Sequence, residues 1–371
     1  MRVAICHDYL NQFGGAERVL QTLLELFPEA DLYTLLYDEE RTRGAFAGRT
    51  VHTSPLDVPF IRHHHRAFIP LMPWAASRVR GGFYDLVISS TAGYAKGFAV
   101  EGAFHLCYTH SPLRYAWERT YLKGTPFTPW PLRRAIADPV AAWLRAWDRR
   151  AADRVDEFIA NSNFIAGKIE RYYGRSAEVI PPPVDTAVFH PEPVPGARTT
   201  YLMAGRLLYY KRFDIGIEAF NRLKRRLVIV GQGPEEAKLR KLVRTPLIEF
   251  AGNPTDAELR LLYSNAKALI FPQVEDFGLV AAEALACGTP VIAYRDGGAS
   301  DIVSDGETGV FFDAQTPHAL VQAVEAFERC SWDREAIARR GARFSKERFK
   351  SDILAFLKRV GIELSAPHAS R

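Results

Sequence analysis

Three consecutive prolines, Pro181–Pro183, interrupt a chain that otherwise alternates short apolar runs with amphipathic stretches. A proline has no backbone N–H to donate and its ring fixes φ, so three in a row fit neither a helix interior nor a central strand. We therefore predict a stiff connector at Ile180–Asp185. The alternation on both sides of it is typical of α/β structure with parallel sheets. Since 371 residues exceed one ordinary domain of roughly 100–200 residues, two domains are expected, 1–183 and 184–345.

Each half carries its own series of predicted strands. Those of the first half are Arg2–Cys6, Asp31–Leu36, Leu86–Ser89, Ala103–Tyr108 and Glu157–Ala160. Those of the second half are Thr200–Ala204, Arg226–Val230, Leu247–Phe250, Ala268–Phe271, Val291–Ala293 and Gly309–Phe312. Helical patterns lie between them, such as the amphipathic stretch Ala16–Leu26. We expect two Rossmann-like domains that face each other across a cleft.

Composition narrows the class of protein. No apolar run approaches the ~18 residues of a membrane-spanning helix, and Met1–Ile5 enters a strand directly, unlike a signal peptide. A net charge of +5 is a mild excess and argues against a nucleic-acid partner. The triple His63–His65 has no carboxylate at helical spacing, so we interpret it as surface and expect no metal site. Scattered cysteines without a C-x-x-C pair favour reduced core thiols in a cytoplasmic protein: Cys6, Cys107, Cys287 and Cys330.

The most informative stretch runs from the predicted strand end at Phe271 through a glycine-containing loop into a predicted helix over Val280–Cys287. Backbone N–H groups at a helix N-terminus bind phosphates and polar hydroxyls. Glu275 precedes this turn and Glu283 lies about two turns into the helix, so the two carboxylates could hold two parts of one elongated ligand. For such a pair taken alone we favour the alternative that Glu275 caps the helix and Glu283 is solvated.

A basic loop follows the first strand of the second half. Gly205 ends that strand, and Arg206 and Lys211 follow it, five residues apart. Arginine offers a planar fork to phosphate oxygens and lysine a point charge, so the pair could close on one diphosphate. A solvated basic loop is the more usual outcome for such a cluster alone.

Two loops of the first half also follow strand ends. Gly14 and Gly15 lie between the first strand and the first helix, where paired glycines let a backbone approach a phosphate or sugar closely. They do not form G-x-G-x-x-G, and a tight turn without a ligand explains them equally well. His110 follows the strand that ends at Tyr108 and is placed to reach into the cleft, with a structural histidine as the even alternative.

Together these motifs resemble retaining glycosyltransferase family 4, which has the GT-B fold of two Rossmann-like domains. The resemblance rests on G-G-A-E-R-V-L near the N-terminus, A-N-S-N-F at Ala160–Phe164, and G-R-L-x-x-Y-K-R-x-D from Gly205. It continues with V-I-V-G-Q-G-P, E-D-F-G-L-V-A-A-E-A-L-A-C-G-T-P-V-I-A and D-G-x-T-G at Asp305–Gly309. The motifs run through nearly the whole chain in the family's order. The stretch Y-T-H-S-P-L-R-Y-A-W resembles bacterial polysaccharide mannosyltransferases in particular.

The resemblance implies a role for each candidate residue. Glu275 would bind hydroxyls of the donor sugar, His110 would touch the C6 side of that sugar, and Glu283 would bind the ribose. Arg206 and Lys211 would hold the diphosphate. The remaining contacts to the nucleotide sugar would come from the backbone at Gly14, Gly15, Gly205, Phe277, Gly278 and Leu279. The sequence has no strict D-x-D, in keeping with metal-independent binding of a donor that is a substrate and not a cofactor.

The resemblance also suggests the substrates. GDP-mannose is the first choice of donor, a UDP-sugar such as UDP-glucose is the alternative, and the base is expected near Phe250–Pro254. The acceptor would be a glycan or a lipid-linked oligosaccharide in bacterial surface-polysaccharide synthesis. The C-terminal helix in residues 346–371 would cross back to the first domain. For the reaction, the resemblance implies a same-face attack in which the leaving phosphate takes the acceptor's proton, with no general base assigned.

Basic and aromatic side chains are interleaved in Phe60–Phe83 and in Pro112–Arg154. This composition suits peripheral binding to the inner face of an anionic plasma membrane. Solvated arginines over a core of tryptophans are an equal alternative. Two rival functions are an NAD-dependent sugar-nucleotide epimerase, for which G-x-G-x-x-G is lacking, and a non-catalytic sugar-nucleotide-binding protein.

Overall fold

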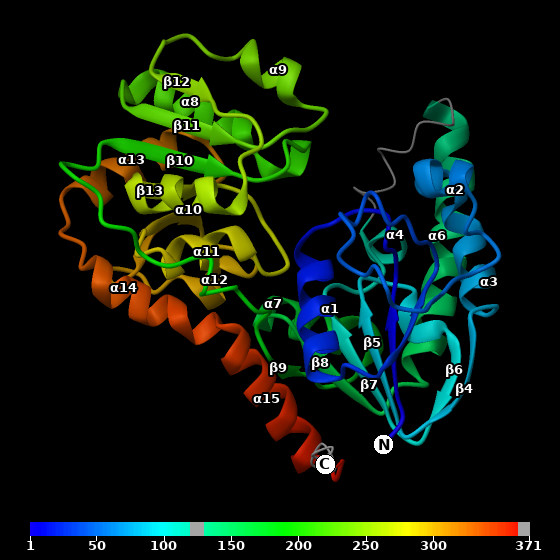
Figure 1. The fold of residues 1–371 in the computed structure, drawn as a ribbon. Helices are drawn as coiled ribbons and strands as arrows, with labels where there is room; N and C mark the ends of the chain where they lie inside the picture. Colours follow the sequence, from blue (N-terminus) through cyan, green and yellow to red (C-terminus); the bar gives the residue numbers. More distant parts are fainter. Residues whose placement is uncertain (119–129, 363–371) are drawn as a thin grey trace. The chain divides into compact units, whose positions relative to one another are not determined.

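The structure is a computed structural model, and it describes residues 1–118 and 130–362, with the side chains of 130–137 left out (Figure 1). It divides into two compact units. Unit 1 is Met1–Pro181 together with the chain from Lys350 onward, and unit 2 is Pro182–Phe349. The connector with its three prolines therefore lies where the two units divide. This position suits prolines, because they lack the backbone N–H that a helix interior or a central strand needs.

Unit 1 is built on a parallel sheet with the strand order β3-β2-β1-β5-β7-β8-β9. Its strands are β1 (Val3–His7), β2 (Asp31–Thr34), β3 (Val51–His52), β5 (Leu86–Thr91), β7 (His105–Thr109), β8 (Glu157–Ala160) and β9 (Glu178–Val179). A separate two-stranded sheet pairs β4 (Arg80–Tyr84) with β6 (Ala99–Gly102). The five predicted strands of this half are all present with small shifts at their ends. The sequence pattern missed β3, β4, β6 and β9.

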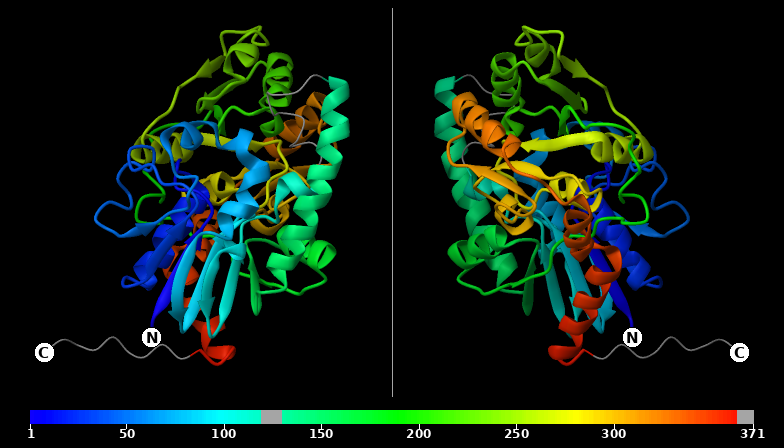
Figure 2. Two further views of the ribbon diagram at one scale, coloured as in Figure 1. Left: turned by 90° about the vertical axis from the view of Figure 1, so that its right-hand side faces the viewer. Right: turned by 90° about the vertical axis from the view of Figure 1, so that its left-hand side faces the viewer.

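The helices of unit 1 cover both faces of its main sheet. They are α1 (Gly15–Leu26), α2 (Pro59–His64), α3 (Met72–Ala76), α4 (Arg114–Trp117), α6 (Trp130–Ala152) and α7 (Asn163–Tyr173), with 3₁₀ turns at His65–Leu71 and Ala95–Gly97. Figure 1 shows α1 on one side of β5 and α3 and α6 on the other, and Figure 2 shows α7 beside α6. Val19, Leu20 and Leu23 are buried on α1, as the amphipathic pattern predicts.

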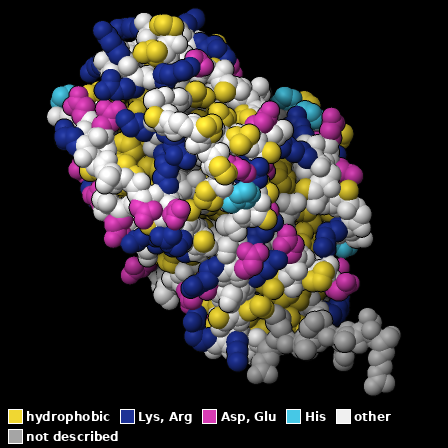
Figure 3. All heavy atoms as spheres, turned by 60° about the vertical axis from the view of Figure 1, so that its left-hand side comes forward, with side chains coloured by type: hydrophobic (Ala, Val, Ile, Leu, Met, Phe, Trp, Pro, Cys, Tyr) yellow, Lys and Arg dark blue, Asp and Glu magenta, His cyan; other side chains and the backbone are white. Residues whose placement is uncertain are grey.

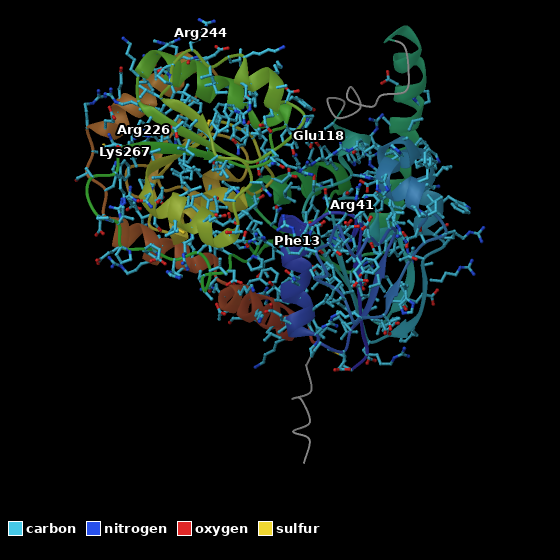
Figure 4. All side chains as sticks on the ribbon, turned by 45° about the horizontal axis from the view of Figure 1, so that its top comes forward. Phe13, Arg41, Glu118, Arg226, Arg244 and Lys267 are labelled. Atoms are coloured by element: carbon cyan, nitrogen blue, oxygen red, sulfur yellow. The ribbon has the colours of Figure 1, made fainter. Side chains whose placement is uncertain are left out.

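Unit 2 is a second doubly wound sheet, again wholly parallel, with the order β12-β11-β10-β13-β14-β15. Its strands are β10 (Thr200–Ala204), β11 (Arg226–Val230), β12 (Ile248–Phe250), β13 (Ala266–Phe271), β14 (Val291–Tyr294) and β15 (Gly309–Phe312). All six correspond to predicted strands. Arg226 and Lys267, labelled in Figure 4, mark the edge of unit 2 at which β11 and β13 begin.

Two apolar layers enclose this second sheet. One layer packs α8 (Phe213–Leu223), α9 (Glu236–Arg240) and α13 (Pro317–Glu328) against it. The other packs α10 (Asp256–Asn265), α11 (Leu279–Ala286), α12 (Ala299–Ile302) and α14 (Arg334–Gly341) against the opposite face. The remaining turns are 3₁₀ segments at Tyr209–Lys211 and Ala342–Phe344, and α15 (Lys346–Arg359) continues from unit 2 into the part of the chain grouped with unit 1.

Candidate functional site

The strand order of unit 2 reverses between β10 and β13. From β10 the chain proceeds outward to β11 and β12, and from β13 it proceeds the other way to β14 and β15. In open α/β sheets, ligands bind beyond the carboxyl ends of the strands at such a switch point, because the loops there part to opposite faces. The loop Gly205–Lys211 follows β10 and the loop Pro272–Gly278 follows β13, so the two predicted donor motifs meet at this point.

A lysine–glutamate pair joins the two loops. Lys211 Nζ donates to Glu275 Oε1, and Gln273 Nε2 donates to the same oxygen at 3.2 Å. The Lys211 side chain is 12% exposed and that of Glu275 is 19% exposed. A half-buried ion pair that remains open to solvent on one side can exchange its partners for those of a polar ligand. Among the polar residues predicted for the site, Lys211 and Glu275 are in direct contact with each other.

The glycine pair Gly297–Gly298 packs against the backbone of the Glu275 loop. Gly298 N donates to Glu275 O at 2.8 Å. A Cβ atom at Gly298 would lie 2.3 Å from Phe277 Cα, and one at Gly297 would lie 2.5 Å from Glu275 O. Glycine is therefore required at both positions for the loop to take this course.

Helix α11 starts directly at the end of that loop. Its N-cap is Gly278, with φ 108°, and a Cβ atom there would lie 2.7 Å from the ring of Phe271. Phe277 is buried before it, and Leu279 is the first residue of the helix. The first-turn amides of a helix carry partial positive charge, so this start suits a phosphate group.

The structure contradicts the alternative in which Glu275 caps the helix and Glu283 is solvated. The helix is capped by Gly278 and not by Glu275. Glu283 is 7% exposed and accepts a hydrogen bond from Tyr263 Oη at 3.1 Å, so it is buried and not solvated. Burial, with Glu283 nearby, raises the pKa of Cys287 to about 12. Two carboxylates thus lie on either side of the helix start, in different degrees of burial.

Arg206 and Gly205 begin the other loop. Arg206 is exposed, and Gly205 lies beneath Lys211, since a Cβ atom there would come 3.7 Å from Nζ. Beyond β12, a pocket of about 470 Å³ opens where the nucleobase was predicted, near Phe250–Pro254. It is lined by Ala251, Asn253, Pro254, Glu258, Leu261, Leu262 and Asn265.

In unit 1 the strand order reverses between β1 and β5, and the glycine motif follows β1. Gly14 is the N-cap of α1, with its N–H donating to Glu17 Oε2 at 2.8 Å, and Gly15 is the first helical residue. The backbone of Gly14 is extended, with φ −150°, so the motif is a helix start and not a tight turn. Of the two amides, that of Gly14 already has an acceptor.

His110 lies just after β7 and is held on several sides. Its backbone N–H donates to Thr91 O at 2.7 Å, its carbonyl accepts from Asn161 Nδ2 at 3.0 Å, and its Nε2 is 2.8 Å from Ser90 Oγ. The sequence pattern indicated His110 as a candidate, because this residue follows the end of a predicted strand. It did not find Ser90, because a serine inside a strand carries no sequence signal.

Asp8 is another polar residue at the unit 1 switch point that the sequence interpretation passed over. It is 6% exposed and accepts hydrogen bonds from the amides of Ala92, Tyr94 and Ala95, at 2.6–2.9 Å, and from Thr91 Oγ1 at 2.8 Å. Its position directly after a buried strand was the available signal. The carboxylate fixes the loop that follows β5.

Some residues lie elsewhere than expected. His63 and His64 are exposed, but His65 is half-buried beside Asn11, and burial lowers its pKa to about 4. Contacts with Asn11 and with the ring of Tyr9 cover His65, although its two neighbours in the triple are exposed. Cys330 is exposed, whereas the other three cysteines are buried. Within the described part of the chain, no three His, Cys, Asp or Glu side chains gather as a metal site requires.

The described tryptophans of Pro112–Arg154 are partly buried against the core or exposed. Trp117 stacks on Tyr172 and donates to Asp148, whereas Trp143 is 43% exposed. The side chain of Trp130 lies outside the described residues. On the face drawn in Figure 3, Lys and Arg side chains are interspersed with Asp and Glu. Among the helices described, none is long and apolar enough to cross a membrane.

One Tyr-x-x-x-Lys spacing occurs, at Tyr263 and Lys267, and the structure separates the two side chains. The hydroxyl of Tyr263 is buried on Glu283, whereas Lys267 pairs with Glu328 at 2.7 Å. This spacing therefore does not form the tyrosine–lysine pair that an NAD-dependent epimerase needs.

Two parallel, doubly wound α/β units, with polar loops at the switch point of each, are the architecture of GT-B glycosyltransferases. Comparison with known proteins agrees. Residues 13–188 match the family Glycosyltransferase Family 4, and residues 186–344 match Glycosyl transferases group 1. The chain belongs to these glycosyltransferases, so the predicted family, fold and enzyme class are confirmed.

Individual relatives show how the family varies. A D-inositol 3-phosphate glycosyltransferase of Pseudarthrobacter chlorophenolicus is 30% identical over 77% of this chain and 70% of its own. A GDP-mannose-dependent alpha-(1-6)-phosphatidylinositol monomannoside mannosyltransferase of Mycobacterium tuberculosis is 31% identical over 47% of this chain and 53% of its own. The solved structure of Anabaena Alr3699/HepE in complex with UDP-glucose covers 97% of this chain and 100% of its own, with TM-score 0.69 and 17% identity. That likeness is one of fold.

Proposed function

We propose that this glycosyltransferase moves a hexose, with retention of configuration and without a metal, from a nucleotide sugar to a glycan or lipid-linked acceptor. The observation that carries the proposal is the Lys211–Glu275 pair at the switch point of unit 2. Glu275 would exchange its lysine and glutamine donors for hydroxyls of the donor sugar, and Glu283 would bind the ribose. His110 is a further contact of the sugar.

The leaving group in such a transfer is a nucleoside diphosphate, whose negative charge grows as the glycosidic bond breaks. Positive groups placed in advance where charge develops lower the barrier, because they need no reorganisation during the reaction. Lys211, Arg206 and the first-turn amides of α11 would supply them, and the amide of Gly15 would add a contact. The leaving phosphate would take the acceptor's proton in a same-face attack, so no general base is assigned.

GDP-mannose is the proposed donor, supported by the mannosyltransferase relative, and UDP-glucose is the alternative, supported by the fold neighbour. A panel of both donors and their nucleotides would be compared by thermal unfolding, since a ligand that binds the folded state raises the apparent midpoint. We expect GDP-mannose to raise it most. A larger rise of the unfolding midpoint with UDP-glucose than with GDP-mannose would reverse the choice of donor.

The site itself is tested by Lys211→Ala and Glu275→Ala. Each variant should lower turnover by about 100-fold or more, with the circular dichroism spectrum unchanged, because each removes a group held against the reacting donor. Lys267→Ala is the matched control, since it breaks another lysine–glutamate pair at the opposite edge of the same sheet. Near-normal turnover in either site variant would refute the assignment.

We also propose peripheral binding to an anionic membrane through Phe60–Phe83. In this stretch Phe60 is 65% exposed and Phe83 is 61% exposed, with Leu71 and Trp74 also on the surface. The exposed basic residues among them include Arg66 and Arg78. Apolar side chains that insert and cations that meet anionic headgroups are the two components of such binding.

A further inference from the structure

A chain of polar side chains in unit 1 connects Glu17 with His110. Strand register produces it: His7 at the end of β1 pairs with Ser90 in β5, and Ser90 pairs with Tyr108 in β7. Since alternate residues of a strand point to the same side, His110 follows Tyr108 on the face that carries His7 and Ser90. Helix α1 covers this face and supplies Glu17.

This series combines hydrogen-bond contacts with one longer electrostatic approach, between Glu17 and His7. Glu17 Oε2 accepts the Gly14 N–H at 2.8 Å, and Glu17 Oε1 lies 3.8 Å from His7 Nε2. Ser90 Oγ lies 3.2 Å from His7 Nδ1 and 2.8 Å from His110 Nε2. Glu17, His7 and Ser90 are each at most 3% exposed. Three buried polar side chains thus connect the start of α1 to a histidine at the end of β7.

The donor and acceptor capacities of these side chains favour one placement of their protons. A serine hydroxyl has one hydrogen and two lone pairs, so Ser90 can donate to one imidazole while it accepts from the other. A carboxylate only accepts, so the Glu17 carboxylate favours a proton on the facing His7 Nε2, which makes Nδ1 of a neutral ring an acceptor. Ser90 then donates to His7 and accepts from His110 Nε2–H. In this arrangement the Glu17 carboxylate favours one direction for the two bonds of Ser90.

We propose that Glu17, His7 and Ser90 are positioning residues that hold His110 as its Nε2–H tautomer, with Nδ1 as the accepting nitrogen. This tautomer would accept a hydrogen bond from a hydroxyl of the donor sugar, and that part of the inference rests on the proposed function. The tautomer itself does not. The Glu17 carboxylate also accepts the N–H of Gly14, the first amide of the glycine motif. Glu17 therefore orients both parts of unit 1 that we propose contact the sugar donor, the glycine motif and His110.

The tautomer is measured on the full chain labelled with ¹⁵N-histidine, by two-bond ¹H–¹⁵N correlation at a pH well above the ordinary imidazole pKa of about 6.5. We expect the His110 proton on Nε2. In Glu17→Gln the single amide oxygen would remain on the Gly14 N–H and the NH₂ would face His7, which reverses every bond. The His110 proton should then move to Nδ1. A wild-type proton on Nδ1, or no change in Glu17→Gln, would overturn the proposal.

Ser89→Ala is the matched control. Ser89 is equally buried in β5, but it points to the opposite face, where its Oγ lies 2.9 Å from His105 Nε2. Its loss removes a serine–histidine bond of the same kind and should leave the His110 signal unchanged.

A kinetic cycle tests the role in transfer. Ser90→Ala should lower kcat/KM about tenfold while the affinity for the free nucleoside diphosphate stays the same. The double variant Ser90→Ala/His110→Ala should be no slower than His110→Ala, because Ser90 acts through His110. Multiplying losses would show a merely structural serine and refute the positioning role. If the wild-type protein transfers no sugar, the proposed function fails. The tautomer measurement would still test whether Glu17, His7 and Ser90 position His110.

Discussion

At the residue scale, Gly278 shows what the loop before α11 demands of its backbone. Its φ of 108° is strained for other residues, and a Cβ atom would meet the Phe271 ring at 2.7 Å. We expect Gly278→Ala to lower the free energy of unfolding by about 2–4 kcal/mol, as strain and overpacking add. Urea unfolding measures the change. Gly252→Ala is the control, since Gly252 has φ 71° with nothing within 4 Å, and should cost only about 1–2 kcal/mol. Equal losses would mean that the ring contact is unimportant.

His105 gives unit 1 a dependence on pH. Burial lowers the pKa of His105 to about 4, whereas an unfolded histidine titrates near 6.5. Between these values the unfolded chain binds the extra proton, so the free energy of unfolding falls as pH is lowered from about 6.5 toward 4. The slope for one histidine is at most about 1.4 kcal/mol per pH unit. In His105→Gln the slope measured by urea unfolding should be shallower, whereas His63→Gln, at an exposed site, should leave it unchanged. An unchanged slope in His105→Gln would contradict this assignment.

How far the site could be predicted depends on which signals a residue carries. Lys211 and Glu275 could be selected as candidates because each follows a strand end in a loop with glycine. This signal is local in the sequence and needs no knowledge of the strand order. That they touch depends on β10 lying beside β13, a strand order that the sequence does not specify. Ser90 and His7 were not found, because their role comes from cross-strand register and from α1.

At the element scale, a buried ion pair ties four elements of unit 1 together. Lys96 Nζ donates to Asp148 Oδ1 at 2.6 Å, and Asp148 Oδ2 accepts from Trp117 and Tyr173, both at 2.8 Å. Asp148 on α6 is fully buried and Lys96 is 2% exposed. We expect Asp148→Ala to lower the free energy of unfolding by about 3–5 kcal/mol, because it leaves the lysine charge buried without its partner.

The double variant Lys96→Met/Asp148→Leu should recover much of that loss, since it removes both charges. Arg226→Ala, which breaks an exposed pair with Glu249, should change stability by less than about 1 kcal/mol. Urea unfolding compares the three. If the double variant were no more stable than Asp148→Ala, the packing of these side chains would matter more than their charge.

The burial of each strand explains which elements could be predicted from the sequence. Strands buried on both faces appear as continuous apolar runs, and all eleven of those expected are present. Of the strands that were missed, β3 and β9 are two-residue edges, whereas β4 (Arg-Gly-Gly-Phe-Tyr) and β6 (Ala-Val-Glu-Gly) have no continuous apolar run. Their pairing is created by tertiary structure, in β4 by its alignment beside β6.

At the scale of the whole molecule, the division into two units was predictable, since three prolines and a restarted strand series leave little choice. The exposed residues of the proposed membrane surface could not be identified from the sequence, because Phe60–Phe83 contains both core and surface residues. Met72 and Ile69 are buried in the core of unit 1, whereas Phe60 and Trp74 are on its surface. The structure thus shows which few apolar side chains of this basic and aromatic stretch are exposed, and these are the ones that we propose insert into a bilayer.

Vesicle flotation tests that surface. The full chain should float with vesicles that contain anionic phospholipid, less so with neutral ones, and less as salt screens the basic residues. Phe60→Ser/Trp74→Ser should reduce flotation about tenfold or more, because two large apolar side chains no longer leave water. Leu261→Ser is the control, since Leu261 is similarly exposed at 46% but lies in unit 2. If the wild-type chain stayed with the soluble fraction, or if the control lost as much binding as the double variant, the exposed apolar side chains of Phe60–Phe83 would not be a membrane surface. A lipid-linked acceptor, as proposed above, would then have to reach the enzyme by another part of the chain.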